Sequence, residues 1–109
     1  MKPVNVQRLA EQDIFEAIDY YAKQAPNVVD RFMKAVDRAM ASIGDSPKTG
    51  SPGFAEVLEI PGLRYRTIAS FPYAAFYQES DHDISVLRVL HHGRDIMSLI
   101  GAADADESF

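Results

Sequence analysis

The stretch ISVLRVLHHGRD, residues 84–95, constrains the fold more than any other part of the chain. In a β-strand, alternate residues point to opposite faces. Both alternate sets of its apolar first part are mostly hydrophobic, so neither side of such a strand can face water throughout. This predicts a strand near the middle of a sheet that is covered on at least one face. The strand ends in two histidines, a glycine and an arginine, and binding sites are often built on such loops at the end of a rigid element.

Length and composition predict one domain that spans residues 1–109. A chain of 109 residues with 47 % hydrophobic residues has room for one core. It contains no cysteine, which excludes disulfides and thiolate chemistry and fits a reducing compartment. The first residues lack the apolar region of a signal peptide, and no apolar run approaches the roughly 18 residues of a membrane span. We therefore expect a cytoplasmic protein without membrane contact.

The charge distribution argues against broad binding of nucleic acids. The net charge is −5: residues 1–43 are neutral, residues 44–61 carry −2, residues 62–94 carry +1, and the chain from Asp95 onward carries −4. Affinity for nucleic acids rests largely on the neutralisation of phosphates by basic side chains. We expect no direct nucleic-acid binding beyond a small arginine patch. Residues 101–109 are predicted to be a flexible acidic tail.

The first half of the chain predicts a short strand, Val4 to Leu9, and then two amphipathic helices that form an antiparallel hairpin. Pro26 ends the first helix, because the residue before a proline avoids the α conformation. Asn27 is the predicted N-cap of the second helix, and Gly44 follows its end. The apolar stripe of the first helix consists of Ile14, Ile18, Tyr21 and Ala25. We expect one of Tyr20 and Tyr21 to pack inward and the other to reach the helix edge.

The second half predicts strands. Ala55–Ile60 and Leu63–Phe71 are expected to form a hairpin around a type II turn at Pro61 and Gly62. Tyr73–Gln78 and the apolar strand from Ile84 complete a four-stranded antiparallel meander, and Asp95–Ile100 predicts a short helix. Helices followed by strands indicate an α+β fold: an N-terminal strand, a helical hairpin and then the meander, with the hairpin on one face. The other face is the predicted working surface, and it would carry some of Glu56, Arg64, Arg66, Tyr77, Arg88 and His91.

The chain resembles the RelE/ParE superfamily of bacterial toxins, and within it most resembles ParE. Five stretches carry this resemblance in the order that the superfamily has them. They are A-x-x-D-I-F-E-A-I-D-Y-Y (Ala10–Tyr21), S-P-K-T-G (Ser46–Gly50), P-G-L-R-Y-R (Pro61–Arg66), F-P-Y-A-A-F-Y (Phe71–Tyr77) and V-L-R-V-L-H-H-G-R-D (Val86–Asp95).

The resemblance implies the toxin of a type II toxin–antitoxin system, neutralised by a cognate antitoxin that wraps an extended segment around the toxin. ParE-type toxins poison DNA gyrase, whereas RelE-type relatives cut messenger RNA on the ribosome. We expect a ParE-like toxin that contacts gyrase through the sheet face and the segment after His92, without a catalytic site or a cofactor. The residues expected to bind the target or the antitoxin are Arg64, Arg66, Tyr77, Arg88, His91, His92 and Arg94.

A RelE-like ribonuclease is the alternative. It would need a base, a cation for the phosphorane charge and an acid for the leaving oxygen. Glu56 or Glu59 could supply the base, Arg64 or Arg66 the cation, and His91 the acid. A third possibility is a relative that has lost toxicity and only binds its antitoxin.

Two pairs of polar residues allow structural interpretations as well. His91 and His92 are adjacent on a strand and point to opposite faces, so they cannot readily share one metal ion, and we expect no metal site. Arg64 and Arg66 lie two residues apart and share a face. They could grip a carboxylate-rich partner or a phosphate, or they could form cross-strand ion pairs with Glu56 or Glu59.

Overall fold

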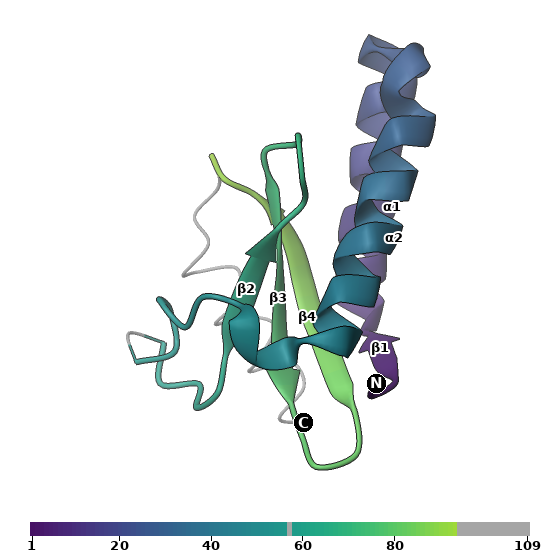
Figure 1. Cartoon of the computed structure of the whole chain (residues 1–109). Coiled ribbons are helices and arrows are strands. Elements are labelled where there is room, and N and C mark those ends of the chain that lie inside the picture. The colour runs from purple at the N-terminus through teal and green to yellow at the C-terminus, as the bar shows by residue number, and fades with distance from the viewer. Residues whose placement is uncertain (57, 94–109) are drawn as a thin grey trace.

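The computed structural model describes residues 1–56 and 58–93 (Figure 1). Its elements are β1 (Val4–Val6), α1 (Arg8–Gln24), the 3₁₀ turn η1 (Pro26–Val28), α2 (Val29–Asp45), the 3₁₀ turn η2 (Pro47–Thr49), β2 (Arg64–Thr67), β3 (Tyr73–Glu79) and β4 (Ile84–His91). The α+β class and the helical hairpin on one face of the sheet are confirmed. The predicted helix Asp95–Ile100 and the predicted tail 101–109 lie outside the described residues, as does Arg94.

The sheet has four strands in the order β1-β4-β3-β2. β2 pairs with β3 and β3 with β4 in antiparallel fashion, whereas β1 is parallel to β4. The predicted four-stranded antiparallel meander is therefore wrong: the meander has three strands, and the fourth strand of the sheet is the N-terminal one. Because β1 and β3 flank it, β4 is the interior strand that its apolar sequence predicts.

The strand predicted at Ala55–Ile60 is also wrong. The described residues of this segment form successive turns, in which the Leu58 amide donates to the Phe54 carbonyl (3.0 Å) and the Ile60 amide to the Ala55 carbonyl (3.0 Å). The predicted type II turn is present, with Gly62 at φ +78°. The segment packs against the face of the sheet that the helices leave open, which we call the second face. The cluster there contains Ile60, Leu63, Ala74, Phe76, Leu87 and Leu90, with Phe54, Ala55, Leu58 and Tyr65 beside it.

Three predicted boundaries shift: the end of β1 and both ends of α2. β1 ends three residues earlier than predicted, because α1 already begins at Arg8. Asn27 does not cap the second helix, since it lies in the 3₁₀ turn that joins the two helices. Gly44 lies inside α2 and is buried there, rather than following the helix. None of the helices in the described part of the chain is long and apolar enough to cross a membrane.

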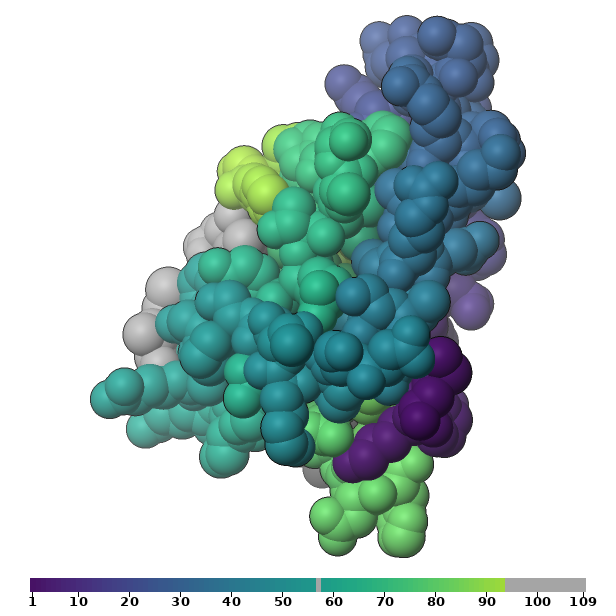
Figure 2. All heavy atoms as spheres, viewed as in Figure 1, coloured from purple at the N-terminus to yellow at the C-terminus, as the bar shows by residue number. Residues whose placement is uncertain are grey.

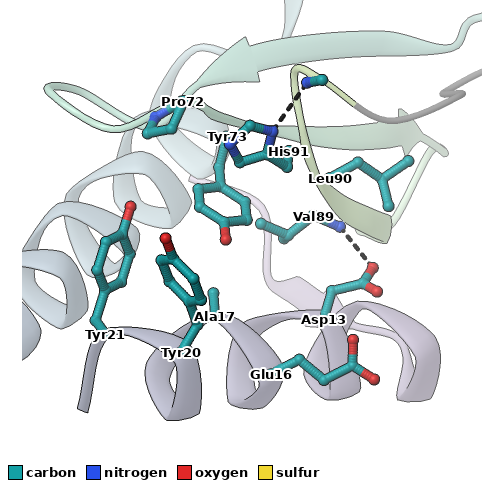
Figure 3. A pocket seen from close by; sticks show the side chains of 11 residues that line it. Asp13, Glu16, Ala17, Tyr20, Tyr21, Pro72, Tyr73, Val89, Leu90 and His91 are labelled. Atoms are coloured by element: carbon teal, nitrogen blue, oxygen red, sulfur yellow. Dashed lines mark hydrogen bonds between the residues drawn. The ribbon is translucent and has the colours of Figure 1, made fainter. Parts of the chain in front are cut away.

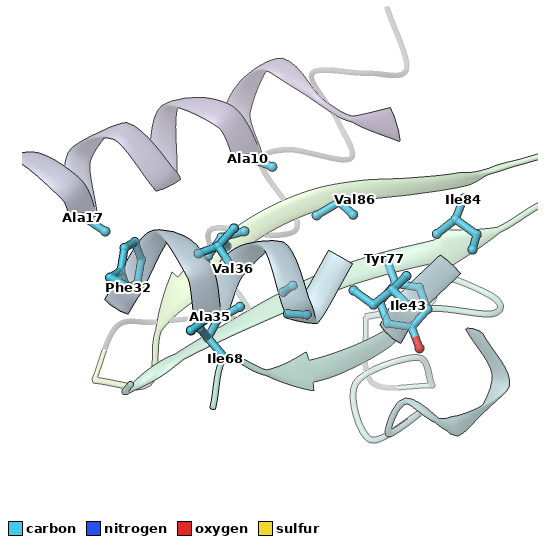
Figure 4. Close-up of a cluster of buried hydrophobic side chains, with 13 residues drawn as sticks. Ala10, Ala17, Phe32, Ala35, Val36, Ile43, Ile68, Tyr77, Ile84 and Val86 are labelled. Atoms are coloured by element: carbon cyan, nitrogen blue, oxygen red, sulfur yellow. The ribbon is translucent and has the colours of Figure 1, made fainter. Parts of the chain in front are cut away.

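The main core lies between the helical hairpin and the face of the sheet that the hairpin covers, which we call the helix face (Figure 4). Small buried residues such as Ala10 and Ala17 let α1 approach the sheet, and Phe32 of α2 is fully buried in the same core. Farther along, the hairpin projects past the end of the sheet, and its tip stands clear of the remaining structure (Figure 2).

The loop after α2 is held against the helix face by side chains of β2 and β3. The Tyr77 hydroxyl donates to the Pro47 carbonyl (2.6 Å), and Arg64 Nη1 donates to the Gly50 carbonyl (2.7 Å). Arg66 Nη2 donates to the Thr49 hydroxyl. The S-P-K-T-G stretch is thus fastened to the sheet by the aromatic and basic residues that sequence analysis assigned to partner binding.

We expect Gly50→Ala to lower the free energy of unfolding by about 2 kcal/mol, because overpacking a tight contact has a cost of this size. A Cβ atom there would lie 2.9 Å from Cζ of Tyr77 and 3.1 Å from the Tyr65 carbonyl, and closer still to the Tyr77 hydroxyl. Urea denaturation would measure the effect. In a protein that already carries Tyr77→Phe, Gly50→Ala should cause a smaller loss of stability than it does in the wild type. Equal losses in the two proteins would exclude the contact with the Tyr77 hydroxyl as the cause.

The acid stability of the fold should depend on Glu79 of β3. Its carboxylate lies 2.8 Å from Lys2 Nζ and 3.0 Å from Lys48 Nζ, and the hydrogen bonds to these two ammonium groups lower the pKa of Glu79. A carboxyl whose pKa is lower in the folded state stabilises the fold above its ordinary pKa, and this contribution is lost as the pH falls through the folded-state pKa. The stability difference between the wild type and Glu79→Gln should therefore shrink between about pH 6 and about pH 3. The stability difference between the wild type and Lys48→Met should have the same sign but be smaller, because only one of the two ion pairs is lost. If the stability difference for Glu79→Gln does not vary with pH, the ion pairs are not its source.

Candidate functional site

A groove of about 510 Å³ lies between α1 and the ends of β3 and β4 (Figure 3). β1 pairs only with the first residues of β4, Ile84 to Val86, and α1 packs along the rest of that strand. The groove opens where the strand ends and the helix continues. Its lining residues are Asp13, Glu16, Ala17, Tyr20, Tyr21, Pro72, Tyr73, Val89, Leu90, His91 and Gly93.

An ion pair between α1 and β4 forms one end of the groove. Asp13 Oδ2 lies 2.7 Å from Nε of Arg88, its Oδ1 lies 2.8 Å from Nη2, and the Val89 amide donates to Oδ2 at 3.0 Å. Both side chains are nearly buried, with 10 % and 12 % of their surfaces exposed. The hydrogen bond to Asp13 raises the pKa of Arg88, and the nearby charge of Glu16 adds a smaller rise. Asp13 thus satisfies the amide of Val89 in the part of β4 that lies beyond the end of β1.

The next turns of α1 supply the floor and the rim of the groove. Ala17 is buried, and its methyl group leaves space that a larger side chain would fill. Glu16 and Tyr20 are exposed, and Tyr20 keeps 56 % of its surface accessible. Among the described residues Glu16 makes no direct ion pair, although its charge acts on Arg88 over a longer distance, and its carboxylate lines the rim.

The rest of the groove wall consists of rings from α1, β3 and β4. Tyr21 packs inward, with its ring centroid 5.2 Å from Phe32 and 6.4 Å from Tyr73, and desolvation raises its pKa, with Tyr20 as a smaller cause. The expectation that one of the two tyrosines packs inward and the other reaches the edge is confirmed. His91 meets Tyr73 edge to face at 5.2 Å. Its Nδ1 accepts a hydrogen bond from the Gly93 amide (2.9 Å), so a neutral ring carries its proton on Nε2.

Four of the predicted binding residues lie on the helix face and not on the second face: Arg64, Arg66, Tyr77 and Arg88. Arg64 and Arg66 share a face, as the two-residue spacing predicts, but they bond to the loop after α2. Tyr77 is fully buried in the main core, and Arg88 is paired with Asp13. The expectation that these residues form an exposed sheet surface is wrong, because alternation along a strand does not tell which face the helices cover.

The two histidines point to opposite faces, as predicted. His91 belongs to the groove, whereas His92 lies on the second face beside Phe54, Tyr65 and Phe76, which line a smaller pocket. In the described part of the chain no group of three or more His, Cys, Asp or Glu residues is placed to hold a metal ion.

The residues of the ribonuclease hypothesis are not brought together. Glu56 and Glu59 lie in the turns that cover the second face, and both are exposed. His91 lies on the helix face at the end of β4. Arg64 and Arg66 donate hydrogen bonds to the loop after α2. The base, the cations and the acid therefore occupy three separate places.

Sequence reasoning missed the groove residues of α1. Asp13 has a recognisable signal, because it falls on the buried stripe formed with Ala10, Ala17 and Tyr21 at spacings of three and four residues. A carboxylate on such a stripe needs a buried partner, and Arg88 is the basic residue within the apolar strand. Glu16 and Tyr20 carry no comparable signal, since exposed polar and aromatic residues are common on helices.

Comparison with known proteins agrees with this fold. Residues 4–96 match the family model described as the ParE toxin of the type II toxin–antitoxin system parDE. Toxin ParE2 of two Mycobacterium tuberculosis strains, CDC 1551 / Oshkosh and ATCC 25618 / H37Rv, is 33 % identical over 82 residues, which cover 74 % of this chain and 72 % of each relative. A chain of the chromosomal ParDE TA system from P. aeruginosa has a similar fold, with a TM-score of 0.69, 20 % identity, and coverage of 84 % of this chain and 96 % of that chain. The chain with this helical hairpin, mixed sheet and groove belongs to the family of ParE toxins of type II toxin–antitoxin systems.

Proposed function

We propose that this chain is the toxin of a parDE pair, that a cognate antitoxin neutralises it, and that it inhibits DNA gyrase by direct binding. The observation that carries this proposal is the family match over residues 4–96. The relatives named ParE2 and the ParDE system with a similar fold support the same assignment. Inhibition through protein–protein contact requires no catalytic site.

The arrangement of side chains favours binding over ribonuclease chemistry. A general base and a general acid must both reach the reacting atoms, within hydrogen-bond distance or through one water. Glu56 and Glu59 lie over the second face, whereas His91 lies in the groove by α1. The overall charge of −5 also gives little attraction for RNA.

The experiment that tests the proposal is induction of the chain in a bacterial host without its antitoxin, with pulse-labelling of DNA and protein synthesis in one culture. We expect DNA synthesis to fall first, and the purified chain to inhibit supercoiling by gyrase. An earlier fall in protein synthesis would favour the ribonuclease and make His91 the residue to mutate. If neither falls while soluble protein accumulates, the chain is an antitoxin-binding relative without toxicity.

We further propose that the segment after His92 contributes to target binding. A chain truncated after Gly93 should bind gyrase less tightly than the full chain, with melting by circular dichroism as the check that it still folds. Full toxicity of a folded truncated chain would exclude the segment from target binding.

A further inference from the structure

The groove by α1 has a carboxylate at its rim, Glu16, that acts on Arg88 only through space and makes no ion pair with the described residues. Asp13 is saturated by Arg88 and by the Val89 amide, so it has little capacity left for a ligand. Glu16, one turn farther along the helix, makes no ion pair among the described residues, and the exposed ring of Tyr20 follows one turn later. We propose that the groove receives an arginine side chain of the antitoxin, whose guanidinium pairs with Glu16 and stacks on Tyr20. This inference rests on the proposed function, since it identifies how the antitoxin would bind.

The chemistry of the groove selects a cation. Carboxylates accept hydrogen bonds, and aromatic faces attract positive charge. Nδ1 of His91 is already engaged by the Gly93 amide, so a neutral ring offers only a donor at Nε2. That donor can bind a carbonyl of the incoming segment but not a second cation. The chain as a whole carries −5, so a basic partner segment is also attracted over longer distances.

Arginine fits the site better than lysine. Its planar guanidinium pairs with a carboxylate through two parallel hydrogen bonds and stacks on aromatic rings, whereas an ammonium group is a compact, strongly hydrated charge. Tyr20, Tyr21 and Tyr73 provide the rings (Figure 3). A volume of about 510 Å³ is typical of pockets for drug-sized ligands and exceeds one side chain, so apolar neighbours of the arginine can enter with it.

The antitoxin is the occupant that the preformed site favours. Tyr21 and Tyr73 are held by ring contacts with Phe32, with centroids 5.2 Å and 5.6 Å apart, so little side-chain freedom is lost on binding. Rigid aromatic contacts of this kind mainly slow dissociation. Neutralisation of a toxin requires such a lasting complex.

A peptide pair tests the chemistry of the site on the full chain. Acetyl-Leu-Arg-Leu-amide and its citrulline counterpart have the same shape but differ in charge, and chemical shifts of the groove residues would report their binding. We expect the arginine peptide to bind about fivefold more tightly, a ratio suited to a partly exposed charge pair. Glu16→Gln should remove most of that preference, leaving the smaller part due to the Tyr20 ring, whereas Glu11→Gln, which removes an exposed charge of α1 outside the groove, should keep it. Equal binding of both peptides to the wild type, or equal effects of the two variants, would overturn the proposal.

Reversing the charge of Glu16 tests whether the antitoxin or the target occupies the groove. The probe is the purified cognate antitoxin of the proposed parDE pair. We expect Glu16→Arg to weaken its binding at least tenfold, and Glu11→Arg to change it less than twofold, with both variants checked by thermal melting. If Glu16→Arg instead abolishes growth arrest while antitoxin affinity is unchanged, the target occupies the groove and the assignment to the antitoxin is wrong. If the wild type causes no growth arrest but Glu16→Arg still weakens antitoxin binding, the inference holds and the proposed toxicity fails.

Discussion

Replacing Asp13 by alanine should lower the free energy of unfolding by about 3 kcal/mol, because breaking a nearly buried ion pair costs this much. The change removes two hydrogen bonds to the guanidinium of Arg88 and the acceptor for the Val89 amide. Only 12 % of the Arg88 side chain is exposed, so water cannot fully replace the lost carboxylate. Chemical denaturation followed by far-ultraviolet circular dichroism would measure the loss.

Three variants identify the cause of that loss. Asp13→Asn keeps an oxygen for the Val89 amide but loses the charge, and should fall between the wild type and alanine. Asp19→Ala, on the same helix, breaks an exposed pair with Lys23 and should cost no more than about 0.5 kcal/mol. The double variant Asp13→Ala/Arg88→Met should recover part of the stability, because a buried pair replaced by apolar groups is often tolerated. A loss for Asp13→Ala as small as that for Asp19→Ala would mean that the pair does not hold α1 against β4.

The helices and strands whose hydrophobic residues follow a clear pattern could be predicted from the sequence. The helices follow from their apolar stripes, and the interior place of β4 follows from a strand that is apolar on both sides. The parallel pairing of β1 could not be predicted, because alternation within a three-residue strand does not specify its partner. The segment from Ala55 to Ile60 was misassigned because short apolar runs fit a strand or a helical turn equally well.

Only a few features of the candidate site could be predicted from the sequence. The shared face of Arg64 and Arg66 and the opposite directions of the two histidines follow from strand geometry, and both are confirmed. Which face the helices cover depends on tertiary packing, and this decided that the arginines fasten a loop instead of facing solvent. The groove arises because β1 stops after Val6 and α1 takes its place beside β4. No local sequence pattern indicates that α1 replaces β1 beside β4.

Replacing Phe32 by alanine should lower the free energy of unfolding by about 4 kcal/mol, which is typical of a fully buried phenylalanine in a well-packed core. Its side chain has no exposed surface, and its ring centroid lies 5.1 Å from Phe71, 5.2 Å from Tyr21 and 5.6 Å from Tyr73. Phe15→Ala is the matched control, because Phe15 of α1 is 60 % exposed and its loss should stay within about 0.5 kcal/mol. Equal midpoints of denaturation for the two variants would show that the ring cluster does not stabilise the fold.

The milder change Phe32→Leu should separate stability from the shape of the groove. Leucine keeps the site apolar and should cost about 1.5 kcal/mol, which a domain of this size can sustain. It nevertheless removes the ring on which Tyr21 and Tyr73 rest, so both tyrosines gain freedom in the groove wall. The variant should therefore stay folded, lose near-ultraviolet circular dichroism from its tyrosines, and bind the arginine peptide more weakly than Phe15→Leu does. Unchanged peptide binding by a folded Phe32→Leu variant would mean that the groove wall is held by the backbone of α1 and β3 and not by the aromatic cluster behind it.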